Sequence, residues 1–179
     1  SDVCSSDLCT ARALHTRGFD IVIHHHLSSA EAEALAASLN AARANSASTV
    51  CADLAAEDAP ARIADAVAEH HRALDLLVNN ASVFDASPLE QVDVAAWERI
   101  QAINLRAPYF LSLACAPLLR ARRGAIVNIT DIHSERPRAG YSAYCASKAG
   151  LVAVTRGLAL EFAPEIRVNA VAPGPILWA

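Results

Sequence analysis

Short β-rich runs alternate with longer helical segments along this chain, and that alternation constrains the fold more than any other feature. The runs at 74–78 and 125–129 are mostly apolar without a polar residue at every second place, which is typical of strands covered on both faces. Strands separated by helices form βαβ units and a parallel sheet. The sequence therefore predicts a doubly wound α/β fold, in which ligands bind beyond the carboxyl ends of the strands.

The other elements are predicted from the same patterns. A helix that ends at Arg17 is closed by Gly18, and Ser28 or Ser29 caps the next helix. In chain order we also expect strands at 19–23, 48–51 and 167–171, and helices at 28–44, 57–71, 95–120 and 142–162.

Composition narrows the class of protein. The 179 residues are 54% hydrophobic and 19% charged, as in one globular domain. A net charge of −4 does not favour a nucleic-acid partner, and the apolar stretches look too short and too often interrupted by charge to span a membrane. The five cysteines form no CxxC pair or zinc spacing, which indicates reduced thiols and a cytoplasmic protein.

Both ends depart from this pattern. Residues 1–8 show no periodicity related to the rest of the chain, and we expect them to be a non-native leader. The chain stops at Ala179, soon after the loop that Pro173-Gly174-Pro175 opens. We expect residues 9–179 to be a partial domain; the alternative is a genuine short arm on a naturally short protein.

Tyr144 and Lys148 are the sharpest chemical feature. Four residues apart, they share one face of the last predicted helix. A neighbouring ammonium favours the phenolate and lowers the pKa of a tyrosine, which would suit Tyr144 to general acid catalysis. Such a pair alone is more often a surface contact, but other polar groups also fall at strand ends or on facing helices: Asp53, Asn79-Asn80-Ala81, Asn104 and Pro173-Gly174.

In this order, the motifs resemble the short-chain dehydrogenase/reductase family from about residue 9 to residue 177. The resemblance implies a Rossmann-like fold and a nicotinamide cofactor. It also implies that Tyr144 donates a proton, that Lys148 holds the nicotinamide ribose, and that Asn104 anchors a water. The remaining implied cofactor contacts are Asp53 with the adjacent Leu54, Asn79, Ala81, Pro173 and Gly174.

Asp131 points to the substrate. It lies thirteen residues before Tyr144, where the family usually carries a serine. A carboxylate repels a developing alkoxide but suits protonated ring nitrogens, and reduction of a C=N bond needs a proton on nitrogen. An aspartate here, and the segments at 131–141 and 173–178, resemble bacterial pteridine reductases, which implies a pterin substrate.

Two loop residues also favour a pterin substrate. Ser82 stands where most of the family has glycine, and Phe84 follows two residues later. In pteridine reductases the matching aromatic stacks on the pterin and sandwiches it against the nicotinamide. Phe84 could instead be a loop aromatic that covers the core.

The end of the 19–23 strand bears on cofactor choice. His24-His25-His26-Leu27-Ser28 contains no carboxylate for the ribose hydroxyls, which favours NADPH over NAD. The 2′-phosphate of NADPH could accept hydrogen bonds from His24 and Ser28 at a helix N-terminus. Pteridine reductases often have an arginine in place of Leu27, and its absence here weakens the assignment. Adjacent side chains on a strand point to opposite faces, so we predict no metal site at the histidines.

The resemblance also implies what this chain lacks: the family's first strand with its glycine-rich turn, and its C-terminal strand. The first strand is central in the family's sheet, so its absence would leave a gap between the second and fourth strands. We expect the 179-residue piece to be inactive and its full-length parent to be a homotetramer, joined through the helices at 95–120 and 142–162.

Two other functions stay open. One is a short-chain reductase of ketones, such as 3-oxoacyl substrates. The other is a non-catalytic subunit that only binds the cofactor, against which intact Tyr144, Lys148 and Asn104 argue. Which pterin would be reduced is also open: biopterin, monapterin, dihydrofolate or a quinonoid form.

Overall fold

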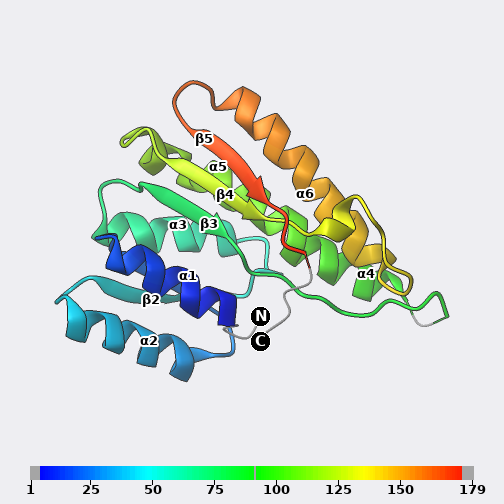
Figure 1. The fold of residues 1–179 in the computed structure, drawn as a ribbon, viewed down its shortest axis with the longest axis horizontal. Helices are drawn as coiled ribbons and strands as arrows, with labels where there is room; N and C mark the ends of the chain where they lie inside the picture. Colours follow the sequence, from blue (N-terminus) through cyan, green and yellow to red (C-terminus); the bar gives the residue numbers. More distant parts are fainter. Residues whose placement is uncertain (1–4, 91, 175–179) are drawn as a thin grey trace.

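The computed structural model describes residues 5–90 and 92–174, with side chains from Leu8 onward. Its helices are α1 (Ser5–Thr16), α2 (Ser29–Ala42), α3 (Ala59–His70), α4 (Val94–Gln101), α5 (Ala107–Arg120) and α6 (Ser142–Glu161). Its strands are β1 (Ile21–His25), β2 (Ala47–Cys51), β3 (Leu76–Asn79), β4 (Ala125–Ile129) and β5 (Arg167–Val171). Figure 1 shows the strands running side by side with helices packed against them.

All strand pairs are parallel, and the helices provide the crossovers between them. β1 pairs with β2, from Ile21 opposite Ala47 to His25 opposite Cys51. The order β3-β4-β5 forms a second sheet, so that β4 has a neighbour on each side. The predicted α/β class with parallel strands is confirmed.

The two sheets do not join. In the described part of the chain, β1 and β3 each have a hydrogen-bonded neighbour on one side only. A cavity of about 730 Å³ lies between them, lined by residues 21–24 of β1 and 76–79 of β3 together with parts of α1, α3 and α5. The predicted gap in the sheet is therefore present, and it continues to Asn80 and Ala81 at the carboxyl end of β3.

The predicted helix at 95–120 contains an interruption. A π-helical turn over residues 102–106 joins α4 to α5, with the amide of Ala107 bonded to the carbonyl of Ala102. Pro108 explains this turn, because it has no N–H for the carbonyl of Asn104 and its ring crowds that carbonyl. The interruption thus occurs around Asn104, a predicted site residue.

The main core joins the three-stranded sheet to α3, α5 and α6, with Leu119, Ile126 and Leu158 fully buried. A second cluster packs Ile23 of β1 against Leu35 and Leu39 of α2. Leu8 of α1 lies against this second cluster, so the fold shows no break at residue 8. That residues 1–8 are a non-native leader stays a prediction.

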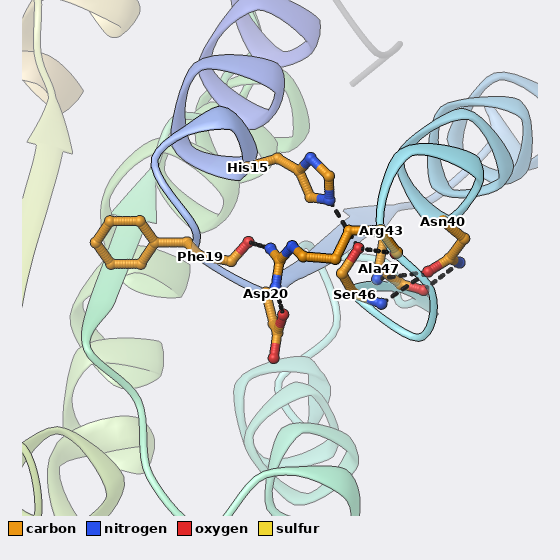
Figure 2. A network of polar contacts seen from close by, with 7 residues as sticks. All are labelled: His15, Phe19, Asp20, Asn40, Arg43, Ser46 and Ala47. Atoms are coloured by element: carbon orange, nitrogen blue, oxygen red, sulfur yellow. Dashed lines mark hydrogen bonds and ion pairs between the residues drawn. The ribbon is translucent and has the colours of Figure 1, made fainter.

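A polar network fixes the amino-terminal end of β1 and β2 (Figure 2). The Ser46 hydroxyl donates to the carbonyl of Arg43 at 2.5 Å, so His15 Nε2 is the donor in its 2.7 Å contact with Ser46 Oγ. Asn40 Oδ1 accepts from the amides of Ser46 and Ala47. Arg43 in turn bonds Asp20 and the carbonyl of Phe19, so the network ties α1, α2 and β2 together.

The stretch Val94–Arg120 is long and apolar enough to cross a membrane by length and composition, contrary to the expectation from the sequence. In the structure 56% of its most apolar window is buried, and the segment packs against α3, α6 and the sheet. These contacts are those of a core helix.

Candidate active site

Three of the predicted catalytic residues meet at the carboxyl end of β4. Asp131 follows that strand, while Tyr144 and Lys148 lie in the first turns of α6. Tyr144 Oη donates to Asp131 Oδ2 at 2.8 Å, and Lys148 Nζ donates to the carbonyl of Ile129 at 2.8 Å. Nζ lies 5.8 Å from the centre of the Tyr144 ring, and both residues are at least 96% buried.

Burial sets the protonation of this group. It raises the pKa of Tyr144, and the hydrogen bond to Asp131 and the charge of that carboxylate raise it further. Burial also lowers the pKa of Lys148 to about 8, which the charge of Asp131 opposes. The expectation that Lys148 lowers the pKa of Tyr144 is wrong for this arrangement, since burial and Asp131 both favour the neutral phenol. Tyr144 therefore holds its proton at neutral pH.

The side chain of Asp131 is held in place because each of its two carboxylate oxygens accepts a hydrogen bond. Oδ1 accepts from the amide of His133 at 2.8 Å and caps a short turn at Ile132–Ser134, while Oδ2 accepts from Tyr144. The backbone of Asp131 is extended, with φ at −160°. The side chain thus points from the end of β4 toward α6.

Asn104 is almost completely buried, and its side chain makes four hydrogen bonds. Oδ1 accepts from the amide of Val83 at 2.8 Å and from the hydroxyl of Ser82 at 3.2 Å. Nδ2 donates to the carbonyl of Val83 at 3.0 Å and to Ser147 Oγ at 3.1 Å. These bonds saturate an amide side chain, so a water at Asn104 would have to bind its backbone. Asn104 fastens the segment that carries Ser82 and Phe84 to α6.

Phe84 lies beside Tyr144, the predicted proton donor. Its ring stacks on Tyr141, with centroids 4.4 Å apart and planes 13° apart, and meets Tyr144 nearly at right angles at 4.6 Å. Phe84 is nevertheless 47% exposed, so part of it is accessible to a ligand. The structure places Phe84 against Tyr144, and its stacking on a substrate stays a prediction.

The side chain of Asn79 is directed into the protein. Its Nδ2 donates to Asn128 Oδ1 at 2.8 Å, and Asn128 Nδ2 donates to Thr155 Oγ1 at 2.8 Å. This buried chain supports the ends of β3 and β4 and directs Nδ2 of Asn79 into the protein interior. Asn79, Ala81, Leu54 and His24 all line the cavity between the sheets.

The predicted phosphate contacts His24 and Ser28 and the predicted cofactor contact Asp53 lie near the carboxyl ends of β1 and β2. His24 Nε2 donates to the carbonyl of Ala52 at 2.9 Å, and burial lowers the pKa of His24, so this ring is neutral. Asp53 Oδ1 accepts from the amide of Ala55 and lies 3.9 Å from His26 Nδ1. Ser28 is buried at the start of α2. Among these groups His26, which the sequence prediction passed over, is partly exposed beside Asp53.

Pro173 and Gly174 reach the same end of the sheet. The carbonyl of Pro173 accepts from the amide of Ile132 at 3.2 Å, and Gly174 lies against the side chain of Ile132. They are therefore adjacent to Asp131. The rest of the 173–178 segment that resembled pteridine reductases lies outside the described residues.

Two residues of the site were missed as functional residues. Tyr141 precedes Tyr144 by one helical turn, and Ser147 precedes Lys148 directly. Spacing gave no signal for Tyr141, because it lies outside the predicted helix at 142–162 and its ring partner Phe84 is in a distant loop. Among the described residues, no group of three or more His, Cys, Asp or Glu side chains is arranged to hold a metal ion.

Comparison with known proteins agrees with this geometry. The sequence model of the short chain dehydrogenase family matches residues 8–178. Pteridine reductase 1 of Leishmania tarentolae is 36% identical over 204 residues, covering 92% of this chain and 70% of the relative. Galactitol 2-dehydrogenase of Agrobacterium fabrum is 39% identical, covering 69% of this chain and 48% of the relative. L-xylulose reductase of Mesocricetus auratus is 39% identical, covering 72% and 52%.

The chain thus spans about two thirds of the first of these relatives and about half of the other two. The match of the family model to nearly the whole sequence confirms the resemblance drawn from Tyr144, Lys148 and the strand-end motifs. The chain belongs to the short-chain dehydrogenase family.

Proposed function

We propose that the full-length protein carrying this chain is a reductase that uses NADPH to reduce a C=N bond of a pterin. The observation that carries this proposal is the 2.8 Å hydrogen bond from Tyr144 to Asp131. A proton donor and a carboxylate lie side by side, as is required by a substrate that must be held by its N–H groups and protonated on nitrogen. The similarity to a pteridine reductase supports the same substrate class.

The residues present fit the nicotinamide end of the cofactor. Of the three N–H donors of Lys148, one is bonded to Ile129, and within the described residues the other two remain for ribose hydroxyls. The backbone of Asn79 and Ala81 and the Pro173-Gly174 turn lie at the same edge of the sheet. When bound, the cofactor supplies hydride.

NADPH is preferred over NAD in this proposal because β1 ends in His25 and is followed by His26 and Leu27, without a carboxylate. A carboxylate there would bind ribose hydroxyls and repel a 2′-phosphate. Ser28, at the start of α2, is the proposed phosphate contact. His24, in β1, is not retained as a donor to the phosphate, because its ring is neutral and its N–H donates to Ala52.

Residues of this chain then carry out the proton transfer. Tyr144 holds a proton on Oη and passes it to the substrate nitrogen as hydride arrives at carbon, so that C=N becomes CH–NH. Lys148 stabilises the tyrosinate that remains, at a distance that favours attraction within a buried site. Asp131 accepts from N–H groups of the pterin and orients its ring beside Phe84.

A ketone reductase is the second candidate. Tyr144 and Lys148 would serve it equally well, and the similarity to L-xylulose reductase favours it. Asp131 disfavours it, because a carboxylate close to Tyr144 Oη would repel the alkoxide that forms on a reduced carbonyl.

Self-association is part of the proposal for the full-length protein. Large apolar side chains are exposed on α4 and α5 (Val94, Trp97, Phe110 and Leu113) and on α6 (Leu160). Exposed apolar surface of this kind is typical of contacts between subunits. We propose a cytoplasmic homotetramer, and sedimentation of the purified protein tests the oligomer.

The substrate proposal is tested by NADPH oxidation with the full-length protein, comparing dihydrobiopterin or biopterin with a 3-oxoacyl thioester. Turnover of the pterin with little of the thioester is the expected result. Turnover of the thioester alone would overturn the pterin assignment while leaving the family unaffected.

A further inference from the structure

Two loops far apart in sequence are joined beside the catalytic tyrosine. Phe84, in the loop after β3, stacks on Tyr141, which directly precedes α6. A second link lies nearby, where the amide of Ser87 donates to the carbonyl of Gly140 at 2.6 Å. Together the stack and the hydrogen bond fix the Phe84 loop against the segment that leads into α6.

Tyr141 is itself held in place from several sides. Gly140 has φ at +77°, a conformation that residues with a side chain rarely adopt, and it directs the chain into Tyr141. The carbonyl of Tyr141 accepts from the amide of Cys145 at 2.9 Å, which ties it to the first turn of α6. The guanidinium of Arg138 lies over the Tyr141 ring, 4.8 Å from its centre.

Arg138 is also anchored to α6. Its amide donates to Cys145 Sγ at 3.5 Å, and its carbonyl accepts from the amide of Tyr141 at 3.2 Å. The order Arg138, Tyr141, Phe84, Tyr144 is therefore a continuous series of ring and cation contacts that ends at the proton donor.

From this arrangement we propose that Tyr141 is a positioning residue that selects flat heteroaromatic substrates, an inference that rests on the proposed function. Tyr141 covers one side of the Phe84 ring and holds that ring across Tyr144. The exposed part of Phe84 then presents a flat surface at a fixed place relative to Tyr144 Oη. A substrate that binds by stacking depends on that surface, whereas an aliphatic ketone does not.

Alternatively, Tyr141 could merely stabilise the loops. Tyr141→Phe and Tyr141→Leu distinguish the two roles, because both remove the hydroxyl and keep an apolar side chain, while only phenylalanine keeps a flat ring. A merely structural role predicts equal loss of activity on all substrates and a lower melting temperature. The positioning role predicts a change confined to binding of flat substrates.

The experiment measures KM and kcat of the full-length protein for dihydrobiopterin, wild type against both variants, with melting temperatures alongside. We expect Tyr141→Leu to raise KM about five- to tenfold with kcat changed less, and Tyr141→Phe to stay near wild type. Ring proton shifts of Phe84 should move in Tyr141→Leu and be retained in Tyr141→Phe.

Equal KM values for wild type and Tyr141→Leu, with pterin turnover intact, would overturn the positioning role and leave the proposed function standing. Parallel losses in both variants would overturn it too, since they would show a need for the hydroxyl or for fold stability. Absence of pterin turnover in wild type would instead refute the proposed function, and the inference with it.

Discussion

Tyr144 and Asp131, thirteen residues apart in sequence, are joined by a 2.8 Å hydrogen bond from the phenol to the carboxylate. β4 and α6 bring them together, because Asp131 follows β4 and Tyr144 lies in the first turn of α6. The bond keeps the proton on Tyr144 and places an acceptor for N–H groups next to it. Pterin reduction is the reaction proposed on that relationship.

Tyr144→Phe removes the transferable proton and keeps the ring that contacts Phe84. We expect single-turnover hydride transfer to slow by about 10²–10⁴-fold, the usual contribution of a general acid, without a change in melting temperature. Tyr109→Phe is the matched control, since Tyr109 packs against Phe110 on α5, away from the site. Equal rates in wild type and Tyr144→Phe would exclude Tyr144 as the proton donor.

The lowered pKa of Lys148 predicts how the free energy of unfolding depends on pH. Its pKa is about 8 in the folded chain against an ordinary value of 10.5, so between these values the unfolded chain binds more protons. Lys148 alone should therefore raise the free energy of unfolding by about 2 kcal/mol from pH 7.5 to 9.5. Burial raises the pKa of Cys115 from 9.0 to about 11, which offsets about 1 kcal/mol of that rise, so the net increase is about 1 kcal/mol. The raised pKa of Tyr144 acts in the opposite direction only above pH 10.

Urea denaturation across that pH range measures this dependence. Lys148→Met should lose this rise, because the titrating ammonium is gone while the opposing effect of Cys115 remains. A wild-type free energy of unfolding that falls between pH 7.5 and 9.5, or a rise that Lys148→Met shares, would contradict the account of Lys148.

Asn104→Ala tests the anchoring of the Phe84 loop. The substitution removes the acceptor of the Val83 amide and leaves the Val83 carbonyl with only a 3.5 Å contact from the Ser82 hydroxyl, in a buried site. We expect a loss of about 1–3 kcal/mol in the free energy of unfolding and faster hydrogen exchange at the Val83 amide. Unchanged exchange at Val83 would show that Asn104 does not hold this loop.

Hydrogen exchange in the 179-residue chain tests the gap between the sheets. The amide of Ile21 bonds to the carbonyl of Ser46, so by alternation the amides of Val22 and His24 point toward the cavity. They should exchange at least about tenfold faster than amides of β4, which is flanked on both sides. Equal protection of β1 and β4 amides would mean that the gap is closed in solution.

Much of the fold was predictable because its signals are local. The bounds of β4 and β5 match the prediction, since each is a short segment with β-branched residues beside polar or turn residues. The π-helical turn at 102–106 was not predicted, because the effect of Pro108 on the helix depends on how the surrounding segments pack. The spacing in the sequence placed Lys148 near Tyr144 but gave no measure of burial. The predicted lowering of the Tyr144 pKa was therefore wrong. Tyr141 was missed because its partner Phe84 lies in a distant loop.

Asp131→Ser in the full-length protein tests the central claim most directly. The measurement is kcat/KM with NADPH for dihydrobiopterin and for a 3-oxoacyl thioester, in wild type and variant, with Asp58→Asn as a control for loss of an exposed carboxylate. The account predicts that Asp131→Ser lowers pterin turnover by about 100-fold and raises thioester turnover, while Asp58→Asn changes neither. Pterin turnover that survives the loss of Asp131, or a thioester rate that falls in parallel with it, would contradict the account.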